Sequence, residues 1–409
     1  MNDSHTERLP QRSPIAGTGS IDPDWEQQRA WVEINLAALA HNVRQLQSLL
    51  APTTQMMAVV KADGYGHGAI DIAQTIIAQG VEWLAVATVT EGIELRAAGI
   101  VAPILILGAV NSDVQVQAIV KWELQPTICT IAQAILLSKA ISQGEGDANA
   151  NLQPNIVLSV HLKLDTGMSR LGANWQHAVT FYREVAQLPY LQIGSLYSHL
   201  ATADDRDPTV MELQLDRFQQ AIAAIAAAGY RLPRLHLANS AGILVSDRSH
   251  YNLVRPGLSL YGLYPAPHLQ QSIDLQPVMS VKARVSQIKQ ITAGTGVSYG
   301  YRFIAERDMP LAVVEIGYAD GVPRRLSNRM QVAIRGCLVP QIGSITMDRM
   351  MLDVSRIPDL QVGEIVTILG RDGSVEITAD DWATELGTIS WEILCGFKHR
   401  LPRVNIGSD

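Results

Sequence analysis

The sequence places a lysine where it could act as a nucleophile. Lys61 directly follows the apolar run Met-Met-Ala-Val-Val at residues 56–60. Burial at the end of a strand disfavours the ammonium form, so a neutral amine becomes available for imine formation with a carbonyl compound. A lysine that extends its charged end into solvent is the alternative. Three glycines among residues 64–68 favour the nucleophile, because glycine lets the backbone approach a ligand closely.

Other polar residues stand at the ends of later strand-like runs. The working residues of a parallel barrel lie at the carboxyl ends of its strands, which share one rim. Ser240 and Gly257 suit phosphate binding; Ser240 could also cap a helix that begins near Ala241, and the two roles are compatible. We therefore expect one site formed by Lys61, Lys163, Asp165, Arg170, His199, Asn239, Ser240, Arg255 and Gly257.

The elements that position these residues alternate along the chain. Eight apolar, strand-like runs are separated by amphipathic helical segments such as 68–78, 90–98, 131–141, 175–186 and 211–228. This alternation predicts an α/β fold, a (β/α)₈ TIM-type barrel. An open doubly wound sheet is the alternative, but the turn after the first strand lacks the GxGxxG spacing. The eight runs are residues 59–61, 84–86, 104–107, 126–129, 159–165, 193–199, 234–239 and 252–257.

Beyond about residue 265 the pattern changes to short alternating runs separated by Gly and Pro. The runs cover residues 278–289, 308–316, 330–334, 350–353 and 364–369, and they predict a mainly β C-terminal domain. We expect a flexible N-terminal arm over residues 1–28, the barrel over 29–265 and the β domain over 266–409. Residues 30–35 also alternate in polarity, ahead of a helix over residues 36–50.

Composition excludes several classes of protein. The 409 residues carry a formal net charge of −7, which argues against a nucleic-acid partner. No apolar stretch is long enough for a membrane span, and the polar N-terminus is unlike a secretory signal. The three cysteines, Cys129, Cys337 and Cys395, form no metal-binding spacing and no paired framework, so we expect thiols in a cytoplasmic protein and no metal.

Eight segments, in order, resemble the motifs of the alanine racemase family. The first is AVVKADGYGHG, which contains Lys61 and Tyr65, and the likeness covers about residues 31–404. One motif would be weak evidence, whereas eight in order are highly specific. The other seven are VHLKLDTGMSRLG (160–172), SHLATAD (198–204), HLANSA (236–241), VRPGL (254–258), VSYG (297–300), GYADG (317–321) and TMD (346–348).

The resemblance implies a homodimer, each chain a barrel followed by a β domain, with the strand near residues 30–35 belonging to the β domain. It implies that pyridoxal 5′-phosphate forms an imine with Lys61. Ser240, Gly257 and nearby amides would hold the phosphate, with Tyr65 close by, and Arg255 would face the pyridine nitrogen. His199 and Asn239 would complete the cofactor-binding set.

The resemblance also assigns the substrate side. Arg170 would contact the phenolic oxygen of the cofactor and help place the substrate carboxylate, and Met347 would bind that carboxylate through its backbone amide. Tyr318 would help to enclose a small side chain. Tyr299, contributed by the other subunit, would be the second base opposite Lys61. Positive charge from His199 and Arg255 would support its phenolate.

The implied reaction is the interconversion of L-alanine and D-alanine, which requires two bases on opposite faces of one carbon. Its implied role is to supply D-alanine for peptidoglycan. An arginine at the pyridine nitrogen would not protonate it, so the ring is a weaker electron sink, which limits side reactions such as transamination. A broad-specificity or serine racemase and a non-catalytic cofactor-binding protein are the alternatives. A decarboxylase of similar architecture would need different motifs.

Two positions need separate comment. The lysine that matches Lys163 is carbamylated in many relatives, and a plain surface contact with Asp165 is the alternative here. Trp391 stands where many relatives have a tyrosine that reaches the cofactor phosphate. Tryptophan has one N–H donor and no hydroxyl, so this contact is either a single N–H bond or lost.

Overall fold

The computed structural model describes residues 28–145 and 157–407. Eight parallel strands form a nearly closed barrel in the order β10-β2-β3-β4-β5-β6-β8-β9, and β7 (Ala173–Asn174) pairs with β6 outside that path. Each of the eight overlaps one of the eight predicted runs, so the expected (β/α)₈ fold is confirmed. Their bounds are β2 Gln55–Val59, β3 Trp83–Val86, β4 Ile104–Ala109, β5 Gln125–Ile128, β6 Leu158–Asp165, β8 Leu191–Tyr197, β9 Arg234–His236 and β10 Leu253–Val254.

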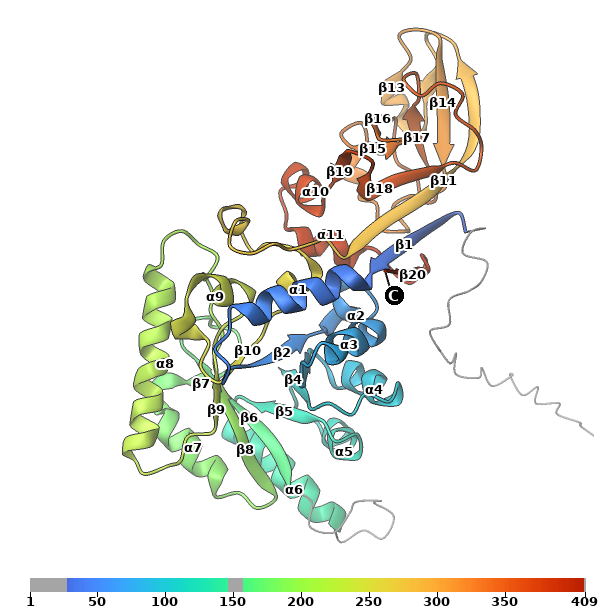
Figure 1. Ribbon diagram of the computed structural model, residues 1–409. Helices are drawn as coiled ribbons and strands as arrows, with labels where there is room; N and C mark the ends of the chain where they lie inside the picture. The colour runs from blue at the N-terminus through green and yellow to red at the C-terminus, as the bar shows by residue number, and fades with distance from the viewer. Residues whose placement is uncertain (1–27, 146–156, 408–409) are drawn as a thin grey trace, which may run out of the picture.

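Helices cover the outside of the barrel (Figure 1). The strands are apolar on both faces because the helices bury one face and the barrel interior the other; all four residues of β3 are buried. Helix α5 (Asp113–Lys121), capped by Ser112, was not predicted. The others are α1 Leu36–Ser48, α3 Ala69–Ala78, α4 Val89–Ala97, α6 Ile131–Glu145, α7 Ala178–Ala186, α8 Thr209–Ala227 and α9 Ser240–Val245.

The C-terminal part is mainly β, as expected. Its sheet has the order β19-β18-β15-β16-β17-β14-β11-β1-β20. The 13-residue strand β11 leaves the barrel and runs the length of this sheet (Figure 1). The bounds are β11 Met279–Ile291, β14 Met309–Val314, β15 Gln331–Ile334, β16 Cys337–Ile342, β17 Met350–Asp353, β18 Ile365–Asp372, β19 Val375–Ile377 and β20 Arg403–Ile406, with the small hairpin β12 Gly296–Val297 and β13 Phe303–Ile304.

Strand β1 (Ala30–Asn35) precedes the barrel in sequence but pairs with the second sheet. It lies antiparallel to β11 and parallel to β20, so both ends of the described chain meet in one sheet. Two helices, α10 (Ala379–Leu386) and α11 (Ser390–Gly396), lie between this sheet and the barrel (Figure 1). The expected arm at residues 1–28 lies outside the described residues except for residue 28.

Within the described ranges, no helix has both the length and the apolarity to cross a bilayer. The same ranges hold no cluster of three or more His, Cys, Asp or Glu residues suited to a metal ion.

Candidate active site

Lys61 begins a left-handed turn, α2 (Lys61–Tyr65), immediately after strand β2. Ala62, Asp63 and Gly64 all have φ and ψ values between 43° and 60°, and Tyr65 has φ 55°. Gly66 N–H donates to Ala62 O at 2.9 Å, which is the spacing of an α-helix with the opposite hand. Each non-glycine residue in this conformation costs about 1–2 kcal/mol, so the turn needs support from its surroundings.

Side chains from several elements supply that support. Glu91 of α4 accepts from Ala62 N–H at 2.7 Å, and its other oxygen accepts from Ala87 and Thr88 N–H at the helix start. Within the turn, Asp63 accepts from Ala69 N–H at 2.8 Å. The buried ring nitrogen Nδ1 of His67 lies 2.9 Å from Gly64 O and 3.0 Å from Tyr65 O.

The β domain also holds this turn. Arg403 of β20 donates from Nη2 to Gly66 O at 2.9 Å, and its other N–H groups bind the carbonyls of Phe397, Lys398 and Leu401. A side chain at Gly66 would come within 2.8 Å of Leu394 O in α11, so this glycine is required by close approach as well as by its φ of 84°. The lysine loop is therefore fixed from both domains.

The environment of Lys61 favours the neutral amine. Burial lowers the pKa of Lys61, and the positive charge of Arg170 lowers it further. Glu91 opposes these two effects. A lysine in this state can attack a carbonyl or accept a proton, which is the chemistry expected from its place after strand β2.

A cavity of about 560 Å³ opens at the carboxyl ends of the barrel strands. Nine of the expected residues line it: Lys61, Tyr65, Lys163, Arg170, His199, Asn239, Ser240, Arg255 and Gly257. Asp165 does not; its carboxylate accepts from Gly167 and Ser169 N–H instead. Trp391 and Cys395 of α11 close one side of the cavity.

One end of the cavity has the form of a phosphate cradle. The Ser240 hydroxyl accepts from Gly257 N–H at 3.0 Å and from Ser259 N–H at 3.3 Å, so its own proton is free to donate. A side chain at Gly257 would lie 2.6 Å from the Tyr65 hydroxyl, and the buried Ser259 hydroxyl has no partner in the described chain. Asn239 is the residue that caps α9, accepting from Gly242 N–H, so the alternative of Ser240 as the helix cap is wrong.

The other end of the cavity is cationic. Arg255 is buried; its Nη1 donates to His236 and its Nη2 to the carbonyls of Ser198 and Leu237. Burial and then Arg255 hold the pKa of His199 well below its ordinary value. The positive charge in this region is therefore that of Arg255 rather than of His199.

Lys163 is buried, with 5% of its surface exposed, so the alternative of a surface contact with Asp165 is wrong. Burial lowers its pKa to about 8, and the charge of Arg255 adds to the effect. The ammonium lies 5.4 Å from the centre of the Tyr197 ring. Lysine and arginine side chains together make this end of the cavity suited to anionic groups.

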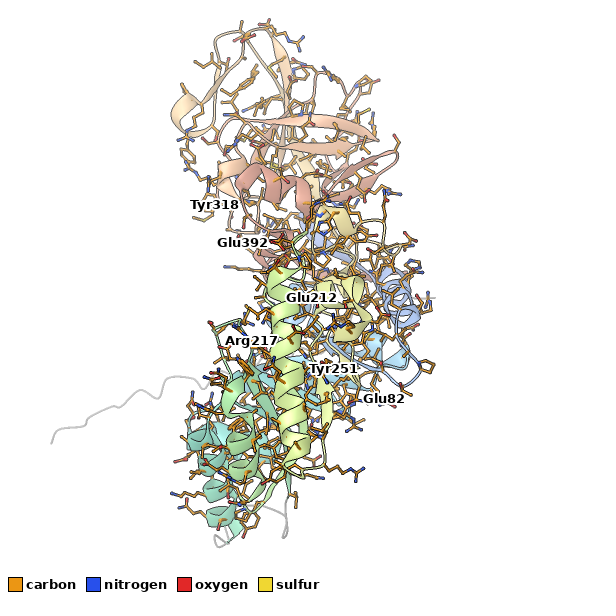
Figure 2. All side chains as sticks on the ribbon, turned by 90° about the vertical axis from the view of Figure 1, so that its left-hand side faces the viewer. Glu82, Glu212, Arg217, Tyr251, Tyr318 and Glu392 are labelled. Atoms are coloured by element: carbon orange, nitrogen blue, oxygen red, sulfur yellow. The ribbon has the colours of Figure 1, made fainter. Side chains whose placement is uncertain are left out.

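Three expected residues do not reach the cavity of their own chain. Tyr299, Met347 and Tyr318 lie on loops of the β domain and are 72%, 52% and 42% exposed. In Figure 2, Tyr318 is at the edge of the β domain nearest the barrel. A single chain thus carries the lysine in a cavity and the tyrosine on a surface.

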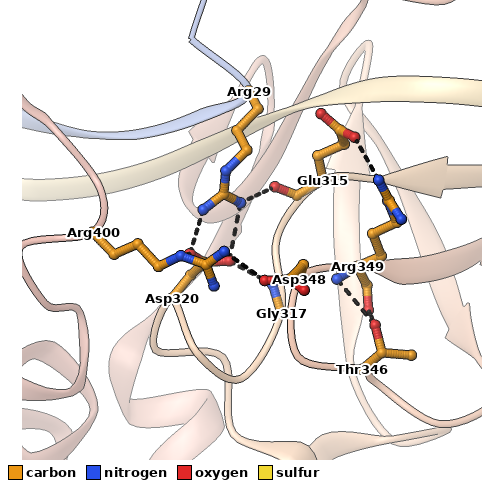
Figure 3. A network of polar contacts seen from close by, with 8 residues as sticks. All are labelled: Arg29, Glu315, Gly317, Asp320, Thr346, Asp348, Arg349 and Arg400. Carbon is orange, nitrogen blue, oxygen red and sulfur yellow. Dashed lines mark hydrogen bonds and ion pairs between the residues drawn. The ribbon is translucent and has the colours of Figure 1, made fainter.

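The loops that carry Tyr318 and Met347 are held by a buried carboxylate (Figure 3). Asp320, fully buried, binds Arg29 through two hydrogen bonds of 2.6 and 3.1 Å and accepts from Gly317 N–H at 3.0 Å. Tyr318 N–H and Ala319 N–H donate to the carbonyls of Thr346 and Met347, which joins the two loops. The sequence motif contained Asp320, but nothing in its spacing indicated this role.

Among the cavity residues that the sequence did not single out are Tyr197 and Cys395. Tyr197 precedes His199 by two positions at the end of β8, and alternate strand residues face the same side, so the strand-end rule could have found it. Cys395 lines the cavity, and burial raises its thiol pKa. No pattern in the sequence distinguished Cys395 from a structural cysteine.

A barrel whose rim combines a lysine of lowered pKa, a phosphate cradle and a buried arginine has the fold and site of barrel-type pyridoxal-phosphate enzymes. The chain matches the family models "Alanine racemase, N-terminal domain" over residues 34–265 and "Alanine racemase, C-terminal domain" over 278–405. It therefore belongs to the alanine racemase family. The expected pyridoxal-phosphate-dependent isomerase is confirmed.

Individual relatives agree along nearly the whole chain. The alanine racemase of Nostoc sp. is 60% identical over 93% of this chain and 97% of its own, and that of Synechocystis sp. is 57% identical over 93% and 99%. Among solved structures, the alanine racemase from E. faecalis superposes with a TM-score of 0.84 at 32% identity and covers 93% of this chain and 98% of its own.

Proposed function

We propose that the protein interconverts L-alanine and D-alanine, with Lys61 as the base on one face of the α-carbon and the partner subunit's Tyr299 as the base on the other. The observation that carries this proposal is that the two bases of one chain lie in different places. Lys61 lines a cavity, whereas Tyr299 is 72% exposed on a loop of the β domain. A two-base site is complete only if a second copy brings its tyrosine to the cavity.

The residues fit the cofactor. Pyridoxal phosphate supplies an electron sink that acidifies the α-hydrogen of a bound amino acid. The Ser240 hydroxyl, whose proton is free, and the closely approached backbone at Gly257 suit its phosphate, and Tyr65 borders the same cradle. Arg255, which lines the same cavity, would face its ring nitrogen, and His199 and Asn239 line the cavity wall.

Proton transfer then depends on groups of the protein. The Lys61 amine, whose pKa is lowered by burial and by Arg170, takes the proton from one face of the carbon or returns it there. The phenol oxygen of the partner subunit's Tyr299 does the same on the other face. Because the two bases differ in position and not in reaction, each enantiomer is deprotonated by its own base.

The substrate side is formed by both chains. Arg170 lines the cavity and suits the substrate carboxylate, for which an arginine fork is the best-matched side chain. The backbone amide of Met347 would bind the same carboxylate, and Tyr318 would limit the space for the side chain. The exposure of both residues supports their contribution across a homodimer interface.

We also propose the domain division of a barrel over residues 29–265 and a β domain over 266–409, with β1 belonging to the β domain. Pairing of β1 with both β11 and β20 supports that assignment. In this arrangement the β domain presents the substrate-side loops and the barrel holds the cofactor.

The test is α-proton exchange of each alanine enantiomer in heavy water. Tyr299→Phe is expected to slow exchange of L-alanine far more than that of D-alanine, because only the tyrosine-side base is lost. Tyr301→Phe is the matched control, since Tyr301 is on the same loop and 68% exposed. Equal loss for both enantiomers would refute the division between the bases, and turnover of serine at the rate of alanine would refute the substrate.

Mixing two inactive variants tests the dimer. Lys61→Ala and Tyr299→Phe chains, combined and allowed to exchange subunits, are expected to recover activity, because one of the two sites in a mixed dimer has both native bases. Recovery should be absent when either variant is mixed with itself. No recovery in verified mixed dimers would mean that Tyr299 acts within its own chain or not at all.

A further inference from the structure

A chain of buried hydrogen bonds crosses the interior of the barrel. It starts at Gln125, the first residue of β5, and passes through His161 of β6, Ser195 of β8 and His236 of β9 to Arg255, which follows β10. The successive contacts are 2.7, 2.6, 2.7 and 2.7 Å. Four neighbouring strands thus contribute one residue each and the turn after a fifth contributes Arg255, from the amino end of β5 to the cavity rim.

All members of this chain except the half-buried Gln125 are shielded from solvent. His161, Ser195, His236 and Arg255 are each at most 3% exposed. The ring of Tyr197 stacks on His236 with centroids 4.5 Å apart and planes 7° apart, and the Arg255 guanidinium lies 5.1 Å from the same ring. The imidazole and the guanidinium are therefore both held by one aromatic side chain.

Because Arg255 can only donate, the direction of every hydrogen bond in the chain can be assigned. A guanidinium only donates, so His236 Nδ1 must accept and its Nε2–H must donate to Ser195. Ser195 O–H then donates to His161 Nδ1, and His161 Nε2–H donates to Gln125 Oε1. Burial lowers the pKa of His161 to about 3 and that of His236 well below its ordinary value, so both rings are neutral, as this order requires.

The hydrogen bonds of Arg255 also show which of its N–H groups are available to the cofactor. Arg255 uses one Nη1 hydrogen on His236, and its two Nη2 hydrogens are shared among the carbonyls of Ser198 and Leu237 and, at 3.4 Å, the His199 Nδ1. Its Nε–H and its second Nη1 hydrogen have no partner within the described residues. If His236 carried its proton on Nδ1, two donors would meet at 2.7 Å and the guanidinium would have to turn.

We propose that Gln125, His161, Ser195 and His236 are positioning residues that form a one-way hydrogen-bond relay, which fixes the tautomer of His236 and thereby aims the two free N–H groups of Arg255 at the ring nitrogen of the cofactor. The proposal rests on the proposed function, because it assigns a purpose to the arginine of that site. The relay keeps the cofactor a weak electron sink, which favours racemisation over transamination.

The test breaks the relay at its centre in the cofactor-loaded enzyme. Ser195→Ala removes the hydroxyl that joins the two histidines, and Ser195→Thr restores it. Ser138→Ala is the matched control. Ser138 is on the outer helix α6, and its buried hydroxyl donates to Pro189 O, so the change deletes a buried serine hydroxyl away from the relay. Histidine tautomers are read from nitrogen-15 chemical shifts of the ring, which do not depend on turnover.

In Ser195→Ala we expect His236 to lose its pure Nε2–H state, kcat to fall about tenfold with KM for alanine little changed, and transamination per turnover to rise about tenfold. Ser195→Thr and Ser138→Ala should match the native enzyme in all three measurements. If Ser195→Ala keeps the native tautomer, or loses it without any change in transamination per turnover, the relay has no positioning role and the proposal is wrong.

A second variant guards against misfolding of the first. Gln125→Leu removes the last acceptor at the far end of the barrel, and it should shift the His161 tautomer and raise transamination in the same direction by a smaller factor. Failure of the proposed function is distinguishable, because it would show as an absence of alanine racemisation in the native enzyme while the histidine tautomers still follow the predicted order.

Discussion

Lys163 is expected to carry a carbamate. The reaction joins the neutral amine to carbon dioxide and releases one proton, so its extent depends on the neutral fraction. Burial, followed by Arg255, lowers the Lys163 pKa from its ordinary 10.5 to about 8. At about pH 7.5 the ratio of neutral amine to ammonium is then about 10^−0.5 in place of 10^−3, a gain of roughly 300-fold over a surface lysine.

The surroundings that disfavour the ammonium also favour the product. The carbamate is an anion, and the charges of Arg255 and Arg170, both of which lower the Lys163 pKa, would then attract it. Arg170 lines the same cavity, so a carbamate would give this arginine a fixed acceptor and a fixed direction. We expect carbamylation to improve alanine binding through the position of Arg170.

The assay is carbon-13 NMR of the enzyme in labelled bicarbonate. One protein-bound carbamate signal is expected, with an intensity that rises as pH increases through about 8, where the amine loses its proton. Lys163→Ala should abolish the signal and raise KM for alanine. Lys139→Ala, a change on the outer helix α6, should leave both unchanged. A signal that persists in Lys163→Ala, or none in the native enzyme at any pH, would refute the reasoning.

Three further substitutions test how the site is supported. Gly257→Ala places a methyl group 2.6 Å from the Tyr65 hydroxyl, and this overpacking, about 1–3 kcal/mol, should weaken cofactor binding in an absorbance titration. Arg403→Met leaves the buried Gly66 carbonyl without its hydrogen-bond donor and should lower the unfolding free energy by about 1–3 kcal/mol in urea. Unchanged stability would contradict the role of Arg403 in holding the lysine turn. Asp320→Asn, at the centre of Figure 3, should raise KM for alanine about tenfold with a smaller effect on kcat; an unchanged KM would show that the loops need no such anchor.

Much of the barrel could be predicted because buried parallel strands are continuous apolar runs, and the eight runs were found within a few residues. Helix α5 was missed because its sequence, DVQVQAIVK, alternates at first like a strand. Predicted strands that extended to His199 and Asn239 ended too late, because the chain turns away from the sheet at the rim where functional side chains are presented.

The site was harder to predict than the fold. The rule that functional residues follow barrel strands located Lys61 and its neighbours. It could not show that Tyr299 is exposed, because the exposure of a loop residue depends on the folded β domain and not on a local sequence pattern. The left-handed turn requires positive φ at both Ala62 and Asp63; alanine rarely adopts it, and aspartate adopts it as a single residue and not in a run. The bond between His161 and Ser195 joins positions 34 residues apart, and only the barrel brings them together.

The reversed turn after Lys61 has a consequence for chemical synthesis of the protein. Ala62 and Asp63 adopt a conformation that is natural for amino acids of the opposite configuration. A D-alanine residue built into the backbone at position 62 would relieve strain of about 1–2 kcal/mol rather than introduce it. The segment that presents the reactive lysine thus has a local shape suited to the enantiomer of its own building blocks.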